Sequence, residues 1–303
     1  MQCFYPISIS NPDYESREIS YKTIYKKIFV PCGRCPACVV GNAHEWRVRL
    51  QEELRSCSSA FFVTLTYDDD SLPIQDVSGI TGYPVVCPVV SKRDVQLFLK
   101  RLRKKFRTSK IRYFLVSEYG PTTLRPHYHA ILFNLPYSGT DLAFVSAKVN
   151  KDLREIWNHG NILVDNVTFG RISYVTKYLC SVTDLPPYLP KPFRLMSRRP
   201  GIGYNYLLQS NRVFWHRSTL SNFYPQDNLK LRLPRFYKDK IFDDAMKLEI
   251  SERSKEYIAN TYHEQKNLAN SLGYRSWYDF RVSSQNAFER RFNNKMKKSR
   301  KDI

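Results

Sequence analysis

The sequence predicts an α+β fold, with helices flanking a central antiparallel sheet and a helical region at the C-terminal end. Short β-branched and aromatic runs alternate with amphipathic segments, two of these runs follow each other across a short turn, and the last part of the chain is polar and helix-prone. We therefore expect a cysteine-containing leader at 1–43, a main domain at 44–205 and a helical basic region at 206–303.

The charge of the chain predicts a polyanionic partner. Its 303 residues carry a formal net charge of +20, from 48 Lys and Arg against 28 Asp and Glu. The 21 Tyr and 18 Phe favour nucleic acid over a membrane surface, because aromatic rings stack on unpaired bases. The N-terminus lacks the pattern of a secretory signal, and the most apolar run is short and broken by prolines, so we expect no membrane-spanning segment.

The first elements follow the leader, which we expect to be extended. Apolar residues at helical spacing predict a helix over 44–57. The run "AFFVTLTY" at 60–67 is typical of a buried strand. Residues 68–90 are rich in Asp, Gly and Pro and indicate a loop.

The clearest predicted helix is 91–107. Ser91 with Asp94 resembles a capping box at its start. One face carries an apolar stripe of Val95, Phe98, Leu99, Leu102 and Phe106. Residues 91–112 contain ten Lys or Arg and one Asp, which favours contact with DNA over a merely solvated face.

The remaining elements complete the sheet and the C-terminal region. Strands are predicted at 111–120 and 127–133, then a helix at 141–157, a strand at 161–168 and a helix at 171–181. The basic end of the chain is equally consistent with a solvated tail and with an arm that holds DNA.

Two histidines lie one residue apart in the predicted strand "RPHYHAILF". Alternate residues of a strand point to the same side, so His127 and His129 present two imidazoles from one face. A hairpin would bring Glu118 beside them, and two His with one carboxylate suit a divalent metal with positions left for a phosphate oxygen. The alternative is that both histidines only satisfy hydrogen bonds in the core.

Tyr174, Lys177 and Tyr178 share one face of the predicted helix at 171–181. A phenol is a poor nucleophile near neutral pH because its pKa is about 10. A neighbouring ammonium would favour the phenolate and offset the charge of a phosphate. Aromatic residues four apart commonly pack in a core instead, but Lys177 between them argues against full burial.

The motif "CGRCPAC" places Cys32, Cys35 and Cys38 at a spacing typical of metal sites. Cys3 could complete a four-thiolate zinc site, with His44 as the competing fourth ligand. An iron–sulfur cluster is less consistent, because the usual fourth Cys-Pro is missing. The odd total of seven Cys favours a reducing cytoplasm with a metal site over a disulfide framework.

Together these motifs resemble the HUH endonuclease superfamily. "FFVTLTYDDD", "EYG", "RPHYH" and "YVTKY" are similar to its motifs, and the whole ordered set is most similar to the replication initiator proteins of microviruses, in particular the gokushovirus branch. "VPCGRCPAC" and "SRRPGIGY" belong to the same pattern, so the resemblance covers roughly residues 1–205. One departure is Tyr128, whose polar tip occupies the hydrophobic position between the histidines.

The resemblance implies an enzyme that nicks single-stranded DNA at a viral origin and starts rolling-circle replication in the cytoplasm of a bacterial host. His127 and His129 would hold Mg²⁺ or Mn²⁺, with Glu118 as the third ligand. The free 3′-OH would prime a host polymerase, and a host helicase would be a further partner.

The resemblance also implies the covalent chemistry. Tyr174 or Tyr178 would form a 5′-phosphotyrosyl link, and the other tyrosine would allow the product circle to be closed. Lys177 would position or neutralise phosphate. Two other interpretations are a non-enzymatic basic DNA-binding or packaging protein, and a transposase of the same superfamily, which usually needs one tyrosine.

Overall fold

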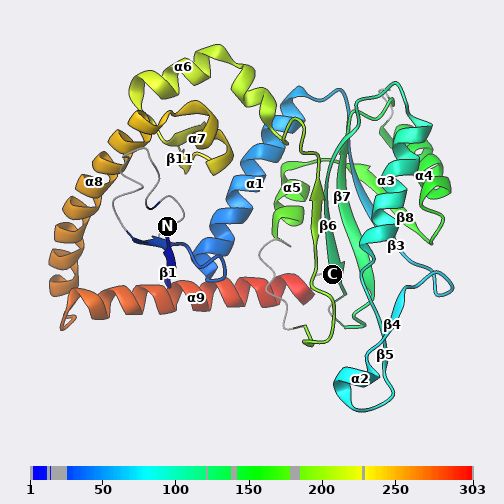
Figure 1. The fold of residues 1–303 in the computed structure, drawn as a ribbon, viewed down its shortest axis with the longest axis horizontal. Helices are drawn as coiled ribbons and strands as arrows, with labels where there is room; N and C mark the ends of the chain where they lie inside the picture. Colours follow the sequence, from blue (N-terminus) through cyan, green and yellow to red (C-terminus); the bar gives the residue numbers. More distant parts are fainter. Residues whose placement is uncertain are drawn as a thin grey trace. The chain divides into compact units, whose positions relative to one another are not determined.

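Strand pairing in the middle of the chain builds a five-stranded sheet in the order β8-β3-β7-β6-β9 (Figure 1). All four pairings are antiparallel, as the sequence predicts. The strands are β3 (Ala60–Thr66), β6 (Arg112–Tyr119), β7 (Pro126–Phe133), β8 (Ile162–Asn166) and β9 (Arg194–Met196). The computed structural model describes residues 3–11, 14, 26–120, 122–137, 142–177, 185–226 and 229–301.

The chain divides into two compact units. One consists of 46–206 and contains the sheet, and the other combines 1–45 with 207–303. The boundary falls within helix α1 (Pro36–Ser56). The leader and the C-terminal region therefore belong to one unit, although the sequence suggested separate parts.

One face of the sheet is covered by α3 (Lys92–Lys105) and α4 (Leu142–Trp157) (Figure 1). The α3 stripe packs as its periodicity predicts, and the Ser91 side chain accepts a hydrogen bond from the Asp94 N–H at the helix start. This core also takes the strand residues that point to the same side. They include Phe61, Val63, Leu65, Leu115, Tyr128, Ala130 and Leu132.

The opposite face of the sheet packs against the second half of α1 and against α5 (Phe169–Lys177). Trp46 and Leu50 of α1 and Ile172 and Val175 of α5 are buried there. Their strand partners are Phe62, Phe114, Val116, Ile131 and Phe133. The predicted helix at 171–181 therefore begins two residues earlier than expected, and its last predicted residues lie outside those the structure describes.

Two regions differ from the sequence-based prediction. The segment 68–90, expected to be a loop, contains a small hairpin with a helical turn at its tip: β4 (Ile74–Asp76), α2 (Ser78–Thr81) and β5 (Val86–Pro88). Three-residue strands give no measurable periodicity, which also explains why β9 was not predicted. The leader is not simply extended, because β1 (Ile7–Ser10) pairs with β2 (Lys27–Val30) and α1 already begins at Pro36.

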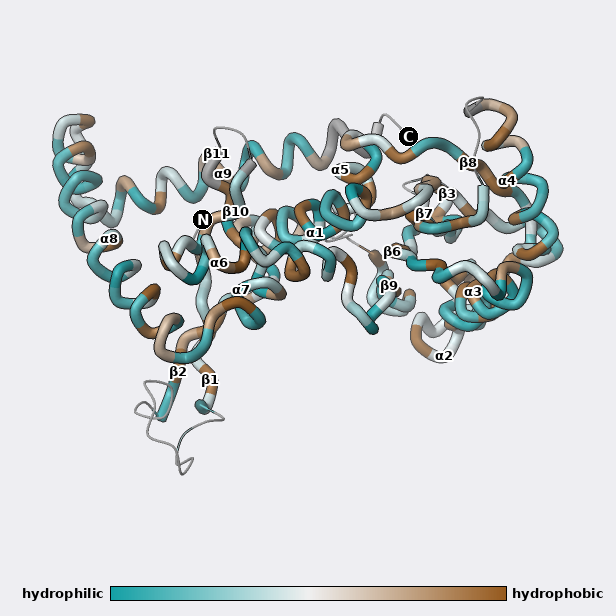
Figure 2. Tube along the Cα trace, turned by 90° about the horizontal axis from the view of Figure 1, so that it is seen from above, coloured by the Kyte–Doolittle hydropathy of each residue, from teal (hydrophilic) through white to brown (hydrophobic). Residues whose placement is uncertain are grey.

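The other unit is mainly helical, as predicted for the C-terminal region. Its elements after the first unit are η1 (Tyr204–Leu208), which begins just before the boundary, α6 (Ser210–Thr219), β10 (Phe223–Gln226), β11 (Leu229–Arg232), α7 (Arg235–Ile241), α8 (Asp244–Ser271) and α9 (Trp277–Lys301). Gly273, with a φ of 77°, lets the chain leave α8 and turn toward α9. Hydrophilic residues dominate the surface of α8 (Figure 2). Among the described residues, none of the helices combines the length and apolar character that crossing a membrane requires.

Candidate metal and nucleophile site

The hairpin of β6 and β7 brings the predicted metal ligands together. Its register pairs Glu118 with His127 and places His129 opposite Val116. The Nε2 atom of His127 lies 3.1 Å from Oε2 of Glu118, and Nε2 of His129 lies 3.3 Å from the same oxygen. The donor atoms of the three residues lie within 4.8 Å of one another. Three side chains from one hairpin thus form a compact donor set.

The other nitrogen of each imidazole has a partner that orients the ring. Nδ1 of His127 lies 3.2 Å from the carbonyl oxygen of Arg125, which can only accept a hydrogen bond. Nδ1 of His129 lies 3.1 Å from the hydroxyl of Thr64 on β3. A ring that donates from Nδ1 presents a lone pair at Nε2, and both Nε2 atoms face Glu118. Metal-binding histidines are held in this way by outer-shell partners.

The electrostatics of the three side chains also suit a divalent cation. Burial lowers the pKa of His129 below its ordinary value, and the hydrogen bond to Glu118 only partly offsets this effect. Burial would raise the pKa of Glu118, but hydrogen bonds from His127 and His129 outweigh it and lower the pKa. Near pH 7 the site therefore holds a carboxylate beside a neutral imidazole, a donor set that fits Mg²⁺ or Mn²⁺.

Tyr128, between the two histidines, points to the opposite face of the sheet. Its side chain is fully buried, so it fills the hydrophobic position as expected. Its hydroxyl accepts from the Ser91 N–H at 2.8 Å and lies 2.9 Å from the hydroxyl of Tyr67, which donates to Asp94 at 2.9 Å. This network ties the histidine-bearing strand to the start of α3, and no sequence motif indicated it.

Of the three candidate residues for covalent chemistry, Tyr174 is the one whose side chain the structure describes. It lies on α5, and its ring is edge-on to that of His129, with 5.3 Å between the centroids. The ring also contacts Phe62 at 6.1 Å and is half-buried. Lys177 is the last residue of α5 and its side chain is not described, while Tyr178 lies outside the described residues.

A further cation, Arg194, shares the sheet face of the metal ligands. It pairs with Val116, which pairs with His129, so the three residues form one row across the sheet. The Arg194 guanidinium lies 5.6 Å from the ring of Trp46, and burial lowers its pKa. The sequence analysis missed Arg194 because β9 was not predicted.

The basic residues near α3 divide into two groups. Arg101, Lys105 and Arg112 make internal contacts: Arg101 donates to the carbonyl of Ile156, Lys105 pairs with Asp152, and Arg112 pairs with Glu53. The others remain on the exposed side, and include Lys92, Arg93, Lys100, Arg103, Lys104, Arg107 and Lys110. Because α3 covers the sheet face opposite to the histidines, this surface is separate from the metal ligands.

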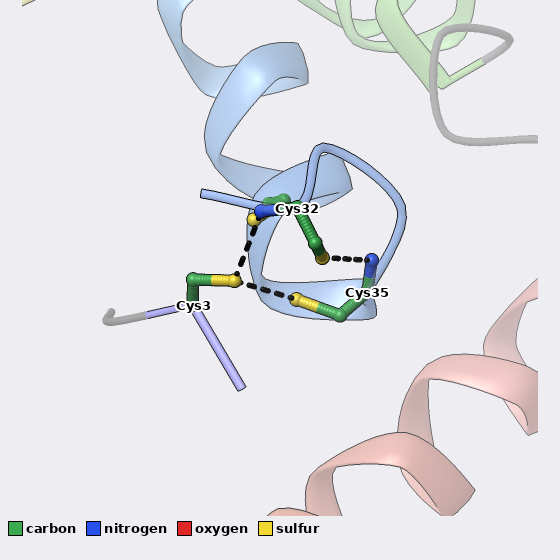
Figure 3. Close-up of side chains that lie close together, drawn as sticks. Cys3, Cys32 and Cys35 are labelled. Atoms are coloured by element: carbon green, nitrogen blue, oxygen red, sulfur yellow. Dashed lines mark hydrogen bonds between the residues drawn. The ribbon is translucent and has the colours of Figure 1, made fainter. Parts of the chain in front are cut away.

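The four predicted cysteines converge in the other unit. Their sulfur atoms lie within 4.8 Å of one another, and the group consists of Cys3, Cys32, Cys35 and Cys38, without His44. Figure 3 shows Cys3 facing Cys35, with 3.8 Å between the sulfur atoms. The fourth ligand in this arrangement is therefore Cys3.

Backbone N–H groups point at these sulfur atoms. Cys32 Sγ accepts from the N–H of Cys35 at 3.3 Å and of Arg34 at 3.4 Å, and these bonds lower the pKa of Cys32 to about 6. The Cys32 N–H donates to Cys3 Sγ at 3.3 Å (Figure 3). Burial raises the pKa of Cys38 to about 12. Four sulfurs of which one already favours the thiolate suit a soft tetrahedral metal ion.

Comparisons with known proteins extend this picture. Residues 60–182 match the family model for replication-associated proteins of the ORF2 type, a range that runs from β3 past α5 and includes every residue of the metal and nucleophile site. No solved structure matches the chain.

Individual relatives are similar over longer stretches. The chain is 23% identical to replication-associated protein ORF2 of Spiroplasma virus 4, over 99% of this chain and all of that protein. It is 25% identical to replication-associated protein VP4 of Bdellovibrio phage phiMH2K over 93% of each, and 27% identical to replication-associated protein ORF4 of Chlamydia phage 1, over 69% of this chain and 53% of the relative. These similarities confirm the resemblance to microvirus replication initiators that the motifs predicted.

Proposed function

We propose that this chain, a relative of microvirus replication-associated proteins, is a metal-dependent DNA-nicking and strand-joining enzyme that starts rolling-circle replication. The observation that carries the proposal is the position of Tyr174, whose ring lies 5.3 Å from that of His129 in the Glu118, His127 and His129 group. A phenol beside a divalent-metal site is the minimum needed to transfer a phosphodiester to a tyrosine.

The proposed first step is an exchange of one phosphate ester for another. The phenolate oxygen of Tyr174 or Tyr178 attacks phosphorus, the bond from phosphorus to the 3′ oxygen breaks, and that oxygen leaves as a 3′-OH after taking a proton. A cation bound by Glu118, His127 and His129 would polarise the phosphate and stabilise the charge that develops on it. Since one ester replaces another, the later joining step needs no nucleotide cofactor.

Lys177 and Tyr178 have roles assigned from their spacing relative to Tyr174. Lys177 would neutralise phosphate charge close to the attacking oxygen. The second tyrosine would cut the regenerated origin, and the released 3′-OH would then attack the first phosphotyrosyl link to close the circle. Either phenol can make the first attack in this scheme.

The DNA partner is supported by charge. The chain carries a net charge of +20, and α3 presents exposed Lys and Arg residues on the sheet face away from the metal ligands. We propose that the scissile single strand lies on the face of His129 and Arg194, while the α3 surface contacts neighbouring duplex. Host polymerase, host helicase and a bacterial cytoplasmic location complete the proposed replication context.

Two different metals are proposed. The hard carboxylate and the two imidazoles of the first site favour Mg²⁺ or Mn²⁺, because open positions can accept phosphate oxygens. The four cysteines favour a structural Zn²⁺, because four thiolates leave no position for a substrate.

A covalent-trapping experiment tests the proposal. Purified protein is mixed with origin-bearing single-stranded circular DNA and Mn²⁺ and then run on a denaturing protein gel. A slower, nuclease-sensitive band is expected, and it should disappear with EDTA and in the Tyr174→Phe, Tyr178→Phe double variant. Tyr83→Phe is the matched control, since Tyr83 is 70% exposed and lies outside the metal and nucleophile site. DNA binding without any adduct would favour a non-enzymatic DNA-binding protein.

A further inference from the structure

The residues directly after Cys3 contact the C-terminal helix of their own unit. The ring of Phe4 is edge-on to that of Phe288 on α9, with 5.7 Å between the centroids. The Tyr5 hydroxyl donates to the Glu289 carboxylate at 3.2 Å. Contacts between residues 284 positions apart in the sequence therefore link the beginning of the chain to α9.

Phe4 belongs to both structures at once. Its backbone N–H donates to Cys35 Sγ at 3.5 Å, so it is part of the shell around the cysteine group. Its side chain lines a hollow between α8 and α9, together with Tyr262, Trp277, Phe280 and Phe288. The position of the cysteine sulfurs and the position of this ring are thus coupled through a single residue.

The helix α9 depends on such contacts for its order. A long, polar helix gains most of its stability from packing rather than from its own propensity. Near its start, Trp277 contacts Tyr262 of α8 at 5.0 Å between centroids and donates to Gln265 at 3.2 Å. Farther along α9, Phe288 and Glu289 are contacted by Phe4 and Tyr5.

We propose that the four-cysteine site is a metal-dependent clasp: Zn²⁺ bound by Cys3, Cys32, Cys35 and Cys38 holds Phe4 in the hollow between α8 and α9 and so keeps α9 in place. The inference rests on the proposed zinc site and is independent of the nicking chemistry. Without the metal, nothing but two thiol hydrogen bonds ties Cys3 to the start of α1 in the described residues, at Cys32 N–H and Cys35 Sγ.

The clasp couples metal binding to chain order through loop closure. Cys3 and Cys32 are 29 residues apart, and ordering a segment of that length against α1 costs conformational entropy. Metal–thiolate bonds supply free energy for such ordering in small metal-binding modules. Loss of Zn²⁺ is therefore expected to release Phe4 and Tyr5 together.

Two measurements on the full-length protein test the clasp. The first is the zinc content by mass spectrometry, with and without a strong chelator. The second is hydrogen–deuterium exchange of peptides covering 284–296. We expect one Zn²⁺ per chain, and about tenfold faster exchange in these peptides after its removal, because an aromatic edge contact and the ordering it provides are worth roughly one power of ten.

Three variants separate the parts of the clasp. Cys3→Ser should lose both zinc and protection of 284–296. Phe4→Ala should keep one Zn²⁺ but show the faster exchange, because only the ring is removed. Cys57→Ser is the matched thiol control, since Cys57 lies in the other unit outside the cysteine group, and should change neither quantity.

The outcomes distinguish the clasp from the zinc site itself. Bound zinc whose removal leaves the exchange of 284–296 unchanged would overturn the clasp and leave the metal site intact. Absence of zinc from protein purified without chelators, with no uptake of added Zn²⁺, would overturn both. Fast exchange in Cys3→Ser alone, without an effect of chelation or of Phe4→Ala, would indicate a folding defect and contradict the clasp.

Discussion

The ring of Tyr174 stands edge-on to the ring of His129, at 5.3 Å between centroids and an interplanar angle of 80°. Two elements far apart in the sequence, β7 and α5, are therefore in direct contact at the residues proposed for metal binding and nucleophilic attack. The predictions below follow from this contact and from the structure that supports it.

Replacing one tyrosine at a time should separate cutting from closing. In Tyr174→Phe the ring still packs on His129 and Phe62, but the attacking oxygen is gone. Circle closure should fall by about a thousandfold or more in Tyr174→Phe and likewise in Tyr178→Phe, because each cycle uses both phenols. Quantifying closed circles from nicked origin DNA checks this. Full closure by either single variant would contradict the two-tyrosine cycle and favour a one-tyrosine enzyme of the transposase type.

Glu118→Gln should weaken Mn²⁺ binding by at least about 100-fold, since even outer-shell partners of metal ligands contribute 10- to 100-fold. The amide keeps the shape of the side chain and removes the charge that faces both histidines. Isothermal titration of the zinc-loaded protein with Mn²⁺ measures the change. Glu155→Gln serves as the control, because that carboxylate is 60% exposed on α4 and pairs with Lys105. Equal affinities of the two variants for Mn²⁺ would show that Glu118 is not a ligand.

Acidification should destabilise the metal-free site. The pKa of His129 is lowered by burial, and the pKa of Glu118 is lowered by the hydrogen bonds from both histidines, which outweigh burial. Both folded pKa values lie below the unfolded ones, so unfolding takes up protons at low pH. The contribution is complete above the ordinary imidazole value of 6.5 and is lost as pH falls below it, and then further below the ordinary carboxyl value of 4.5.

Thermal unfolding in EDTA at a series of pH values measures this effect. His129→Gln should have a flatter pH profile just below pH 6.5 than the unaltered protein, because the titrating imidazole is absent. Identical slopes would mean that His129 is not held neutral by its surroundings.

Gly160→Ala should destabilise the sheet unit by at least about 2 kcal/mol. Gly160 has a φ of 141°, and a Cβ there would collide with the backbone of Thr66 and Asp68 at the end of β3. Gly79→Ala is the matched control, since nothing lies within 4 Å of a Cβ at that position and its φ is not positive. Chemical denaturation of both variants checks the prediction, and an equal stability of the two would contradict it.

The α3 surface should affect duplex binding and not cleavage. Lys100 and Lys104 are exposed and lie on the sheet face opposite to the histidines. In the double variant Lys100→Gln, Lys104→Gln, the dependence of log affinity on log salt should become shallower by about 0.9 for each phosphate that is no longer neutralised. Adduct formation on a short single strand should be unchanged. An unaltered salt dependence would mean that these lysines only solvate the helix.

The sequence predicts the centre of the sheet well because its pattern is physically strong there. His127 and His129 alternate with Tyr128 and Ala130, and only one hairpin register buries the apolar set, so Glu118 had to lie beside the histidines. The stripe on α3 is predicted for the same reason. These elements carry several residues of one periodicity.

What the sequence could not predict are contacts made by single residues from distant segments. Thr64 orients His129 and Tyr67 binds Tyr128, yet neither stands in a pattern that announces a partner. Arg194 sits on a three-residue strand, too short for a periodic signal. The contact between Phe4 and Phe288 joins opposite ends of the chain, and no local preference encodes it.

The two faces of β7 restrict how the length of this protein can vary among its relatives. His129 needs one face and Tyr128 the other, so one residue inserted within β7 between Tyr128 and Phe133 would turn part of the strand over and expose residues that now fill both cores. The turn between β6 and β7 carries no such constraint. Insertions and deletions should therefore gather in the turn at 120–125, while the distance in residues from His127 to Phe133 stays the same in every working descendant.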